Sequence, residues 1–273
     1  MEIDTSTRLV IAGATFAFFA ILEAIYPHRA AYTEKSRRWG ANLGLFVVDL
    51  LAVGIPLGTV AFGLILFAES QTWGLMHMID LPFWVKAVVG FICLDALLYF
   101  QHRLSHKAPL LWRLHRVHHA DPDFDVSTGL RFHPLEIILS MLIKIAVVVL
   151  IGAPLLAVIT FEIVLNATSL FNHGNVAIPA RLERPLRYLL VTQEMHRIHH
   201  SQTMHETNSN YSFNLSLWDR LFNSYTEQAE AGSDGIRIGL SDYPDQHQTT
   251  RLPGMLMIPF SRPSADLQSP PKV

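Results

Sequence analysis

The sequence is poor in cysteine and in charged residues, and both shortages limit the functions to consider. Cys93 is the single cysteine among 273 residues, which excludes an internal disulfide and any zinc or iron–sulfur site built from several cysteines. It lies in an apolar run, where we expect a small buried side chain. Only 16% of the residues are charged, against about 25% in a typical soluble domain. Half of the residues are hydrophobic, so the composition predicts a membrane protein.

Two well-known motifs are also missing, and the net charge is small. The chain contains neither the GxGxxG pattern of dinucleotide-binding folds nor the HExxH pattern of zinc proteases. The formal net charge of −2 gives no reason to expect nucleic-acid binding.

Five apolar stretches determine the expected fold, and they cover residues 9–26, 43–68, 83–100, 135–151 and 155–171. A helix needs about 20 apolar residues to span a bilayer, so the first three predict spans. The first lacks a basic start and a cleavage site, so we expect an uncleaved helix. Only Gly152-Ala153-Pro154 separates the last two, which predicts a helical hairpin whose ends return to the same membrane face.

The basic residues predict the orientation. Four lie at 29–38, none at 69–82 and four at 103–116. Because Lys and Arg accumulate on the cytoplasmic side, we expect residues 27–42 and all segments after residue 100, apart from the hairpin, on that side. Lys144 and Glu162 lie nine residues on either side of Ala153. We expect them at similar depth in the hairpin, where the two charges could pair.

Histidine is the residue type that stands out, with 14 copies, ten of them between His102 and His200. Three motifs hold eight of these: HxxxH at 102–106, and HxxHH at 115–119 and at 196–200. Residues three and four apart share a helix face, so each motif projects its imidazoles in one direction. Imidazole suits Zn, Cu, Fe and Ni, and eight exceed the needs of one ion. The motifs therefore predict a di-metal centre.

Other histidines fall into two classes. His173 lies where the hairpin returns to the cytoplasmic face and is expected to be a ligand. His133 lies where the hairpin begins and could be a ligand or a hydrogen-bond partner of one. The remaining four have no partner at helical spacing and are expected outside the site: His28, His77, His205 and His247.

The motif series resembles the fatty acid hydroxylase superfamily, which includes the sterol desaturases. The resemblance covers about residues 42–225, and the matching segments are 95–102, 111–115, 131–136, 172–175, 210–211 and 217–222. Ser212 stands where glycine is usual, and Asn223-Ser224 stands where Gly-Thr is usual. We divide the chain into N-terminal transmembrane helices (1–82), a fatty acid hydroxylase-like catalytic domain (83–226) and a polar C-terminal tail (227–273). Within the tail, residues 252–260 are apolar and expected against the core or the interface, and residues 261–273 are expected to be disordered.

The resemblance implies an all-α integral membrane protein with four to five membrane helices (three spans plus the hairpin) and a cytosolic His-rich helical cap that holds two irons. Zinc could replace iron in a purified form. The implied ligands are His102, His106, His115, His118, His119, His173, His196, His199 and His200, with His133 as a possible tenth. Metal-bound histidines commonly donate their other N–H to a polar partner. Candidate partners are Asp95, Glu136, Asn172, Asn175, Glu194 and Asp219.

The implied reaction is hydroxylation or desaturation of a lipid, such as a sterol or a fatty acyl chain, with O2 as co-substrate. Since the chain shows no cofactor motif of its own, electrons are expected from a separate ferredoxin, cytochrome or reductase. A bacterial inner membrane is the expected location. Three other classes remain open: a membrane zinc hydrolase, a metal-storage or transport protein, and a haem protein. The missing HExxH counts against the first, the position of the histidines at one membrane surface against the second, and their number against the third.

Overall fold

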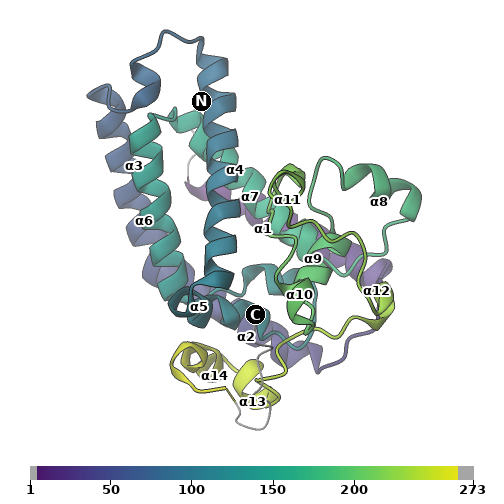
Figure 1. The fold of residues 1–273 in the computed structure, drawn as a ribbon. Helices are drawn as coiled ribbons and strands as arrows, with labels where there is room; N and C mark the ends of the chain where they lie inside the picture. The colour runs from purple at the N-terminus through teal and green to yellow at the C-terminus, as the bar shows by residue number, and fades with distance from the viewer. Residues whose placement is uncertain (1–4, 264–273) are drawn as a thin grey trace.

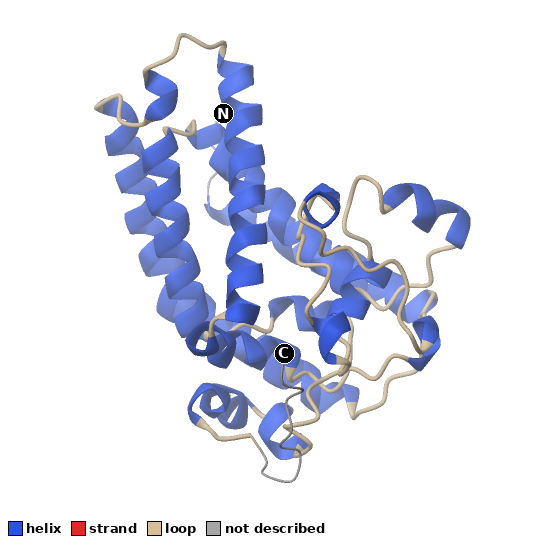
Figure 2. Ribbon diagram, in the orientation of Figure 1, coloured by secondary structure: helices blue, strands red, loops and turns tan. Residues whose placement is uncertain are grey.

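The computed structural model describes residues 5–263, and within that range it contains helices, turns and loops but no strand (Figure 2). Four helical segments are long and apolar enough to cross a membrane: Lys35–His77, Phe83–Lys107, Pro134–Ile151 and Leu155–His173. Helix α1 (Thr5–Ile25) contributes a shorter apolar segment, Leu9–Ile25. The predicted all-α membrane fold is therefore confirmed. The expected disorder of 261–273 falls mostly outside the described residues.

The second apolar stretch belongs to a longer helical segment than expected. Helix α2 (Lys35–Asp49) continues through a π-helical turn (Leu50–Gly54) into α3 (Ile55–Ser70). The wider turn comes just before Pro56, which has no backbone N–H to donate, so a regular α-helical ladder is interrupted there. Lys35 and Arg38 precede the apolar stretch 43–68, and their charges predict a cytoplasmic loop between the first two helices. They lie on the first turns of α2, because buried carboxylates surround Arg38 and stabilise its charge there.

The apolar helices form one bundle (Figure 1). Helix α6 (Pro134–Ile151) contacts α3 and α4 (Phe83–Lys107), and α7 (Leu155–His173) contacts α4 and α1. The buried core of this bundle includes Leu94, Val148 and Phe161. Many other apolar side chains point outward, as expected for helices whose surroundings are lipid.

The predicted hairpin is present between α6 and α7. Gly152 ends α6 with φ of +69°, a conformation that glycine adopts without the steric cost of a side chain. A side chain at Gly74 would lie 2.2 Å from the Gly152 nitrogen, so the 71–82 loop packs directly on this turn. The predicted charge pair also forms, with Lys144 Nζ 2.6 Å from Glu162 Oε1. The pair links α6 to α7 within the bundle.

The cap is built from short helices at one end of the bundle (Figure 1). They are α5 (Pro109–His119), α8 (Ala180–Leu186), α9 (Gln193–His199), α10 (Met204–Thr207), α11 (Leu217–Leu221), α12 (Gly232–Gly235), α13 (Gln246–Thr249) and α14 (Leu252–Met257), with 3₁₀ turns at Val126–Leu130 and Ile258–Phe260. A further 3₁₀ turn, Leu75–His77, lies at the other end of the bundle, in the loop that packs on the hairpin turn. Met255 and Ile258 are fully buried against Leu45 of α2 and Val117 of α5. The apolar 252–260 segment therefore lies against the core, which is one of the two positions that the sequence predicted.

Candidate metal centre

The structure gathers nine of the ten candidate histidines into two groups. The first group is His102, His106, His115, His119 and His199. The second group is His118, His173, His196 and His200. Within each group the candidate ligand nitrogens all lie within 4.8 Å of one another. The groups are adjacent, since the rings of His119 and His200 stack with centroids 4.4 Å apart.

Each HxxHH motif contributes to both groups. His115 and His119, four residues apart on α5, point into the first group, whereas His118 points into the second. On α9 the pattern is reversed: His196 and His200 serve the second group and His199 serves the first. At about 100° per residue, the side chain three positions on lies about 60° to one side of the first and the side chain four positions on lies about 40° to the other side, so the last two diverge by about 100°. The motif therefore brings two metal sites side by side.

In each of five histidines, one ring nitrogen lies within hydrogen-bond distance of an oxygen atom. His102 Nδ1 lies 2.8 Å from the Tyr211 carbonyl oxygen, and His199 Nδ1 lies 2.7 Å from that of Ser209. His118 and His173 use the carbonyl oxygens of Arg131 (3.2 Å) and Ser169 (2.7 Å) in the same way. His115 Nδ1 lies 2.7 Å from Glu136 Oε1. Because these oxygens only accept, Nδ1 carries the proton and Nε2 is left with its lone pair free.

The free nitrogens fit a metal ion. All five Nε2 atoms of the first group are buried without a hydrogen-bond partner, which is costly unless something binds them. In the second group, His173 Nε2 lies 3.1 Å from His118 Nε2 and 2.9 Å from His196 Nε2. Two nitrogens about 2.1 Å from one ion at right angles are about 3.0 Å apart. An all-imidazole donor set of this kind suits iron, zinc or copper.

Burial favours the neutral form of five imidazoles in the cap, because it lowers their pKa values. It lowers the pKa of His199 to about 3. Burial, followed by the proximity of other histidines, also places the pKa values of His118, His119, His196 and His200 well below 6.5. A neutral imidazole is the form that binds a metal, so the site is ready for a cation near neutral pH.

The six polar residues expected near the ligands have different neighbours. Glu136 bonds directly to His115. Asp219 accepts from the Tyr211 and Ser212 backbone N–H groups at 2.7 and 2.9 Å, and so holds the segment whose carbonyl oxygen meets His102. Asp95 accepts from Trp218 Nε1 at 2.7 Å.

The other three residues of this set contact neighbouring segments. Asn172 donates to the Phe213 carbonyl oxygen, Asn175 bonds to the Arg29 backbone, and Glu194 pairs with Arg197.

His133 lies outside both groups. Its Nδ1 accepts from the Leu135 N–H at 3.2 Å, which caps α6, and its Nε2 lies 3.3 Å from the Leu256 carbonyl oxygen. We therefore leave it out of the proposed ligand set. The four histidines expected outside the site also belong to neither group. Two of them lie near carboxylates, His28 by Asp234 and His205 by Glu230.

A buried polar network behind the second group was not foreseen. Arg38 of α2 pairs with Asp121 at 2.9 Å and with Asp125. Burial alone would raise the pKa of Asp121, but the charges of Arg38 and Arg131 lower it below its usual value. Arg131 also donates to the Val117 carbonyl oxygen at 2.7 Å. The network fixes residues 121–131, which include the carbonyl oxygen that holds His118. The sequence does not indicate it, because Arg38 lies among other charged residues and 83 positions before Asp121.

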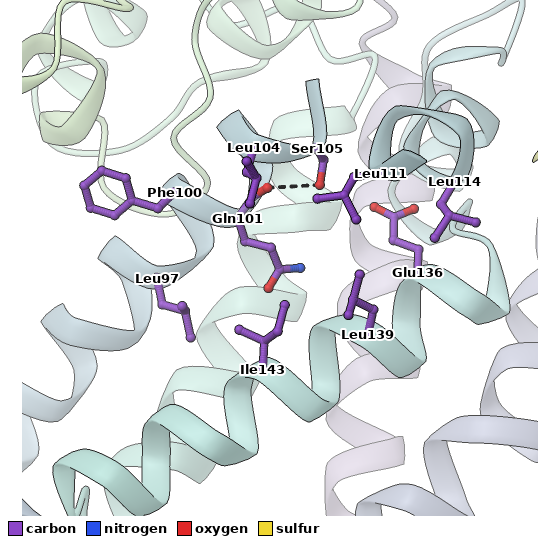
Figure 3. Close-up of a pocket in the computed structure, with 10 residues that line it drawn as sticks. All are labelled: Leu97, Phe100, Gln101, Leu104, Ser105, Leu111, Leu114, Glu136, Leu139 and Ile143. Carbon is purple, nitrogen blue, oxygen red and sulfur yellow. Dashed lines mark hydrogen bonds between the residues drawn. The ribbon is translucent and has the colours of Figure 1, made fainter. Parts of the chain in front are cut away.

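A cavity of about 190 Å³ adjoins the first group (Figure 3). Its lining comes from α4, α5 and α6 and is mostly apolar, with Leu97, Leu139 and Ile143 among its walls. Phe100 and Leu104, about half exposed on the outside of the bundle, form part of the rim. Glu136, the partner of His115, lines it too. The cavity therefore extends from the outward-facing surface of α4 to Glu136, the hydrogen-bond partner of His115.

Comparisons with known proteins identify the family to which the chain belongs. The sequence model of the family described as fatty acid hydroxylase matches residues 87–224. The chain is 31% identical over 239 residues to the ornithine lipid hydroxylase of Rhizobium tropici, covering 84% of this chain and 70% of that protein. It is 28% identical over 230 residues to the alkylglycerol monooxygenase of Xenopus tropicalis, covering 81% of this chain and 48% of that protein.

A more distant relative is a very-long-chain aldehyde decarbonylase of Oryza sativa, 24% identical over 208 residues, with 72% of this chain and 30% of that protein covered. No solved structure matches the chain. The family match covers the helices that carry all nine grouped histidines. The chain therefore belongs to the fatty acid hydroxylase family, as its histidine motifs predicted.

Proposed function

We propose that this membrane protein is a di-iron hydroxylase that uses O2 and external electrons to oxidise an aliphatic carbon of a lipid. One observation carries the proposal: nine histidines, eight of them buried, form two adjacent groups beside an apolar cavity whose rim faces lipid. Two bound irons would supply the redox chemistry that activates O2, which zinc cannot do. The relatives named lipid hydroxylase and alkylglycerol monooxygenase support hydroxylation ahead of desaturation.

The protein's own residues hold the site and keep it dry. The histidines of the first group, apart from the slightly more exposed His106, are at most 8% exposed, so water is largely excluded from the place where the lipid would react. Glu136 keeps the His115 proton on Nδ1, which directs Nε2 into the group. Trp112 covers the His106 and His119 rings at centroid distances of 5.0 and 5.4 Å. The apolar walls of the cavity would hold the lipid chain against this group.

We further propose that the site faces the cytoplasm of a bacterial cell, in the inner membrane. The basic residues Lys35 and Arg38 lie on α2, next to the cap, and Arg113 and Arg116 lie on α5 within the cap (Figure 1). The positive-inside rule places the cytoplasm on this side. Electrons would then come from a separate cytoplasmic donor such as a ferredoxin, a cytochrome or a reductase.

The test is metal analysis of protein purified without oxygen from iron-replete cells, together with His118→Ala and His199→Ala. These two histidines serve different groups, so each variant should lose about half of the iron. We expect two irons per chain in the unaltered protein and a spectrum that changes on reduction and on exposure to O2. One tightly held zinc without redox response would contradict the oxidase and favour a zinc hydrolase.

A further inference from the structure

Three polar side chains line the apolar cavity, and two of them have an oxygen atom without a partner. Ser105 Oγ donates to the Gln101 backbone carbonyl oxygen at 2.9 Å and is satisfied. Gln101 Oε1 and Glu136 Oε2 are buried with no hydrogen-bond partner. Figure 3 shows the Gln101 side chain reaching from α4 toward Ile143 of α6, with Glu136 farther along the same helix.

Buried polar atoms in proteins are nearly always satisfied, and an exception calls for an explanation such as a bound group. Both oxygens here can accept a hydrogen bond. The side-chain amide of Gln101 could be turned so that its nitrogen takes the place of the oxygen, but Glu136 has no such freedom. One of its oxygens already accepts from His115 Nδ1, and the other is also an acceptor.

An occupant of this cavity therefore needs two properties. It must be largely aliphatic to fit walls such as Leu97, Leu139 and Ile143. It must also present a hydrogen-bond donor, an amide N–H or a hydroxyl, to Gln101 and Glu136. A carboxylate has no donor and would place a second negative charge beside Glu136, so the head of an ionised fatty acid does not fit.

We propose that the cavity selects a lipid chain carrying an amide N–H or a hydroxyl group, and that Gln101 and Glu136 hold this donor. The substrate assignment rests on the proposed function, because it identifies the cavity with the place where the lipid is oxidised. Glu136 contacts both the cavity and His115, so a donor held there keeps the neighbouring carbons of the chain next to the first group. Gln101 acts as a specificity determinant.

Binding measurements can test this selection without relying on turnover or on iron. The full-length protein in lipid nanodiscs is titrated calorimetrically with N-methyldecanamide, methyl decanoate and decanoate, and empty nanodiscs correct for partition into the bilayer. The amide and the ester have similar length and both carry a carbonyl, but only the amide has an N–H. We expect the amide to bind about tenfold more tightly than the ester, the factor that corresponds to about 1.4 kcal/mol, and decanoate to bind most weakly.

Two variants locate the effect. Gln101→Leu should reduce the amide affinity to that of the ester and leave the ester affinity within about twofold, because a twofold change is less than one hydrogen bond provides. Leu139→Met, a volume-conserving change in the same wall, should preserve the preference for the amide. Equal affinity for amide and ester in the unaltered protein would overturn the proposal, whatever happens to the variants. A preference that survives Gln101→Leu would overturn the role of Gln101.

The outcomes separate this proposal from the proposed function. If the protein holds two irons but binds the amide and the ester equally, the hydroxylase stands and the selection of a donor fails. If the preference is present but the protein holds only zinc, the cavity selects its ligand as proposed and the oxidase fails.

Discussion

The two histidine groups are built by shared motifs, yet their surroundings differ. The first has five histidines, all with unpartnered Nε2 atoms, and it adjoins the apolar cavity through Glu136. The second has four; two of them are fixed by backbone carbonyl oxygens, as His102 and His199 are in the first, but Phe124 lies over the second group at 5.2 Å from the His200 ring. We infer from this difference that the first group would meet the substrate, whereas the second would hold its ion farther from the cavity.

The largest expected effect comes from removing one ligand from either group. His106→Ala should remove the first iron and His196→Ala the second, because each leaves its ion with one fewer nitrogen and a hole in a buried site. We expect iron to fall from about two to about one per chain in each variant and lipid product to fall below detection. Iron analysis and lipid mass spectrometry measure both. Retention of both irons in either variant would show that its histidine is not a ligand.

A second prediction concerns the network behind the second group. Arg38→Met leaves the buried carboxylates of Asp121 and Asp125 without their cation, a change that typically costs about 3–5 kcal/mol. We expect a clearly lower melting temperature and preferential loss of the second iron. Arg37→Met is the matched control, since Arg37 is half exposed and pairs with Glu34 at the surface, where ion pairs contribute about 1 kcal/mol or less. Equal effects of the two variants would contradict the structural role of the network.

The third change should affect the first group alone. Glu136→Gln weakens the partner of His115 Nδ1, and losses of such partners reduce metal affinity or activity by about 10- to 100-fold. Competition with a chelator, followed separately for the two irons, measures the affinity of each histidine group for its iron. Glu69→Gln, at an exposed position near the end of α3, serves as control. Weakening of the second iron as much as the first would mean that the two groups respond as one.

The smallest effect is expected at Asn223, which has φ of +55°. Ser224 beside it donates to Asp219, the residue that holds the Tyr211 segment over the first group. Asn223→Ala should cost about 1–2 kcal/mol, because a left-handed conformation is strained for alanine, whereas Asn223→Gly should cost little. Thermal unfolding compares the two. If the alanine and glycine variants were equally stable, backbone strain would not explain why asparagine occupies position 223.

Much of the fold could be predicted because it follows from long apolar stretches and their breakers. The hairpin at Gly152, the Lys144–Glu162 pair and the packing of residues 252–260 were expected. The start of α2 was not, because Lys35 and Arg38 look like loop residues until their carboxylate partners are known. Asn223 stands where the resemblance leads one to expect glycine, and its positive φ explains why a residue tolerant of that conformation is found there.

The sequence predicted which histidines come together in the site, but it did not predict how they divide between the two groups. Helical spacing places His115, His118 and His119 near one another, but it does not say which of them serves which group. Backbone carbonyl oxygens hold four of the rings, and they belong to Tyr211, Arg131, Ser169 and Ser209. Because every residue has such a carbonyl group, the sequence does not show which ones bond to a histidine. His133 lies in a motif that matches the family, yet its role in capping α6 depends on the position of Leu135.

The most direct test of the account is a single turnover with labelled oxygen. Iron-loaded protein in its native lipids is reduced chemically under anaerobic conditions, exposed to ¹⁸O₂ and analysed by lipid mass spectrometry. We predict that one lipid class gains a single ¹⁸O atom, and that His118→Ala and His199→Ala abolish this gain. A protein that holds two irons and consumes O2 but incorporates no ¹⁸O into any lipid would contradict the assignment of a lipid hydroxylase.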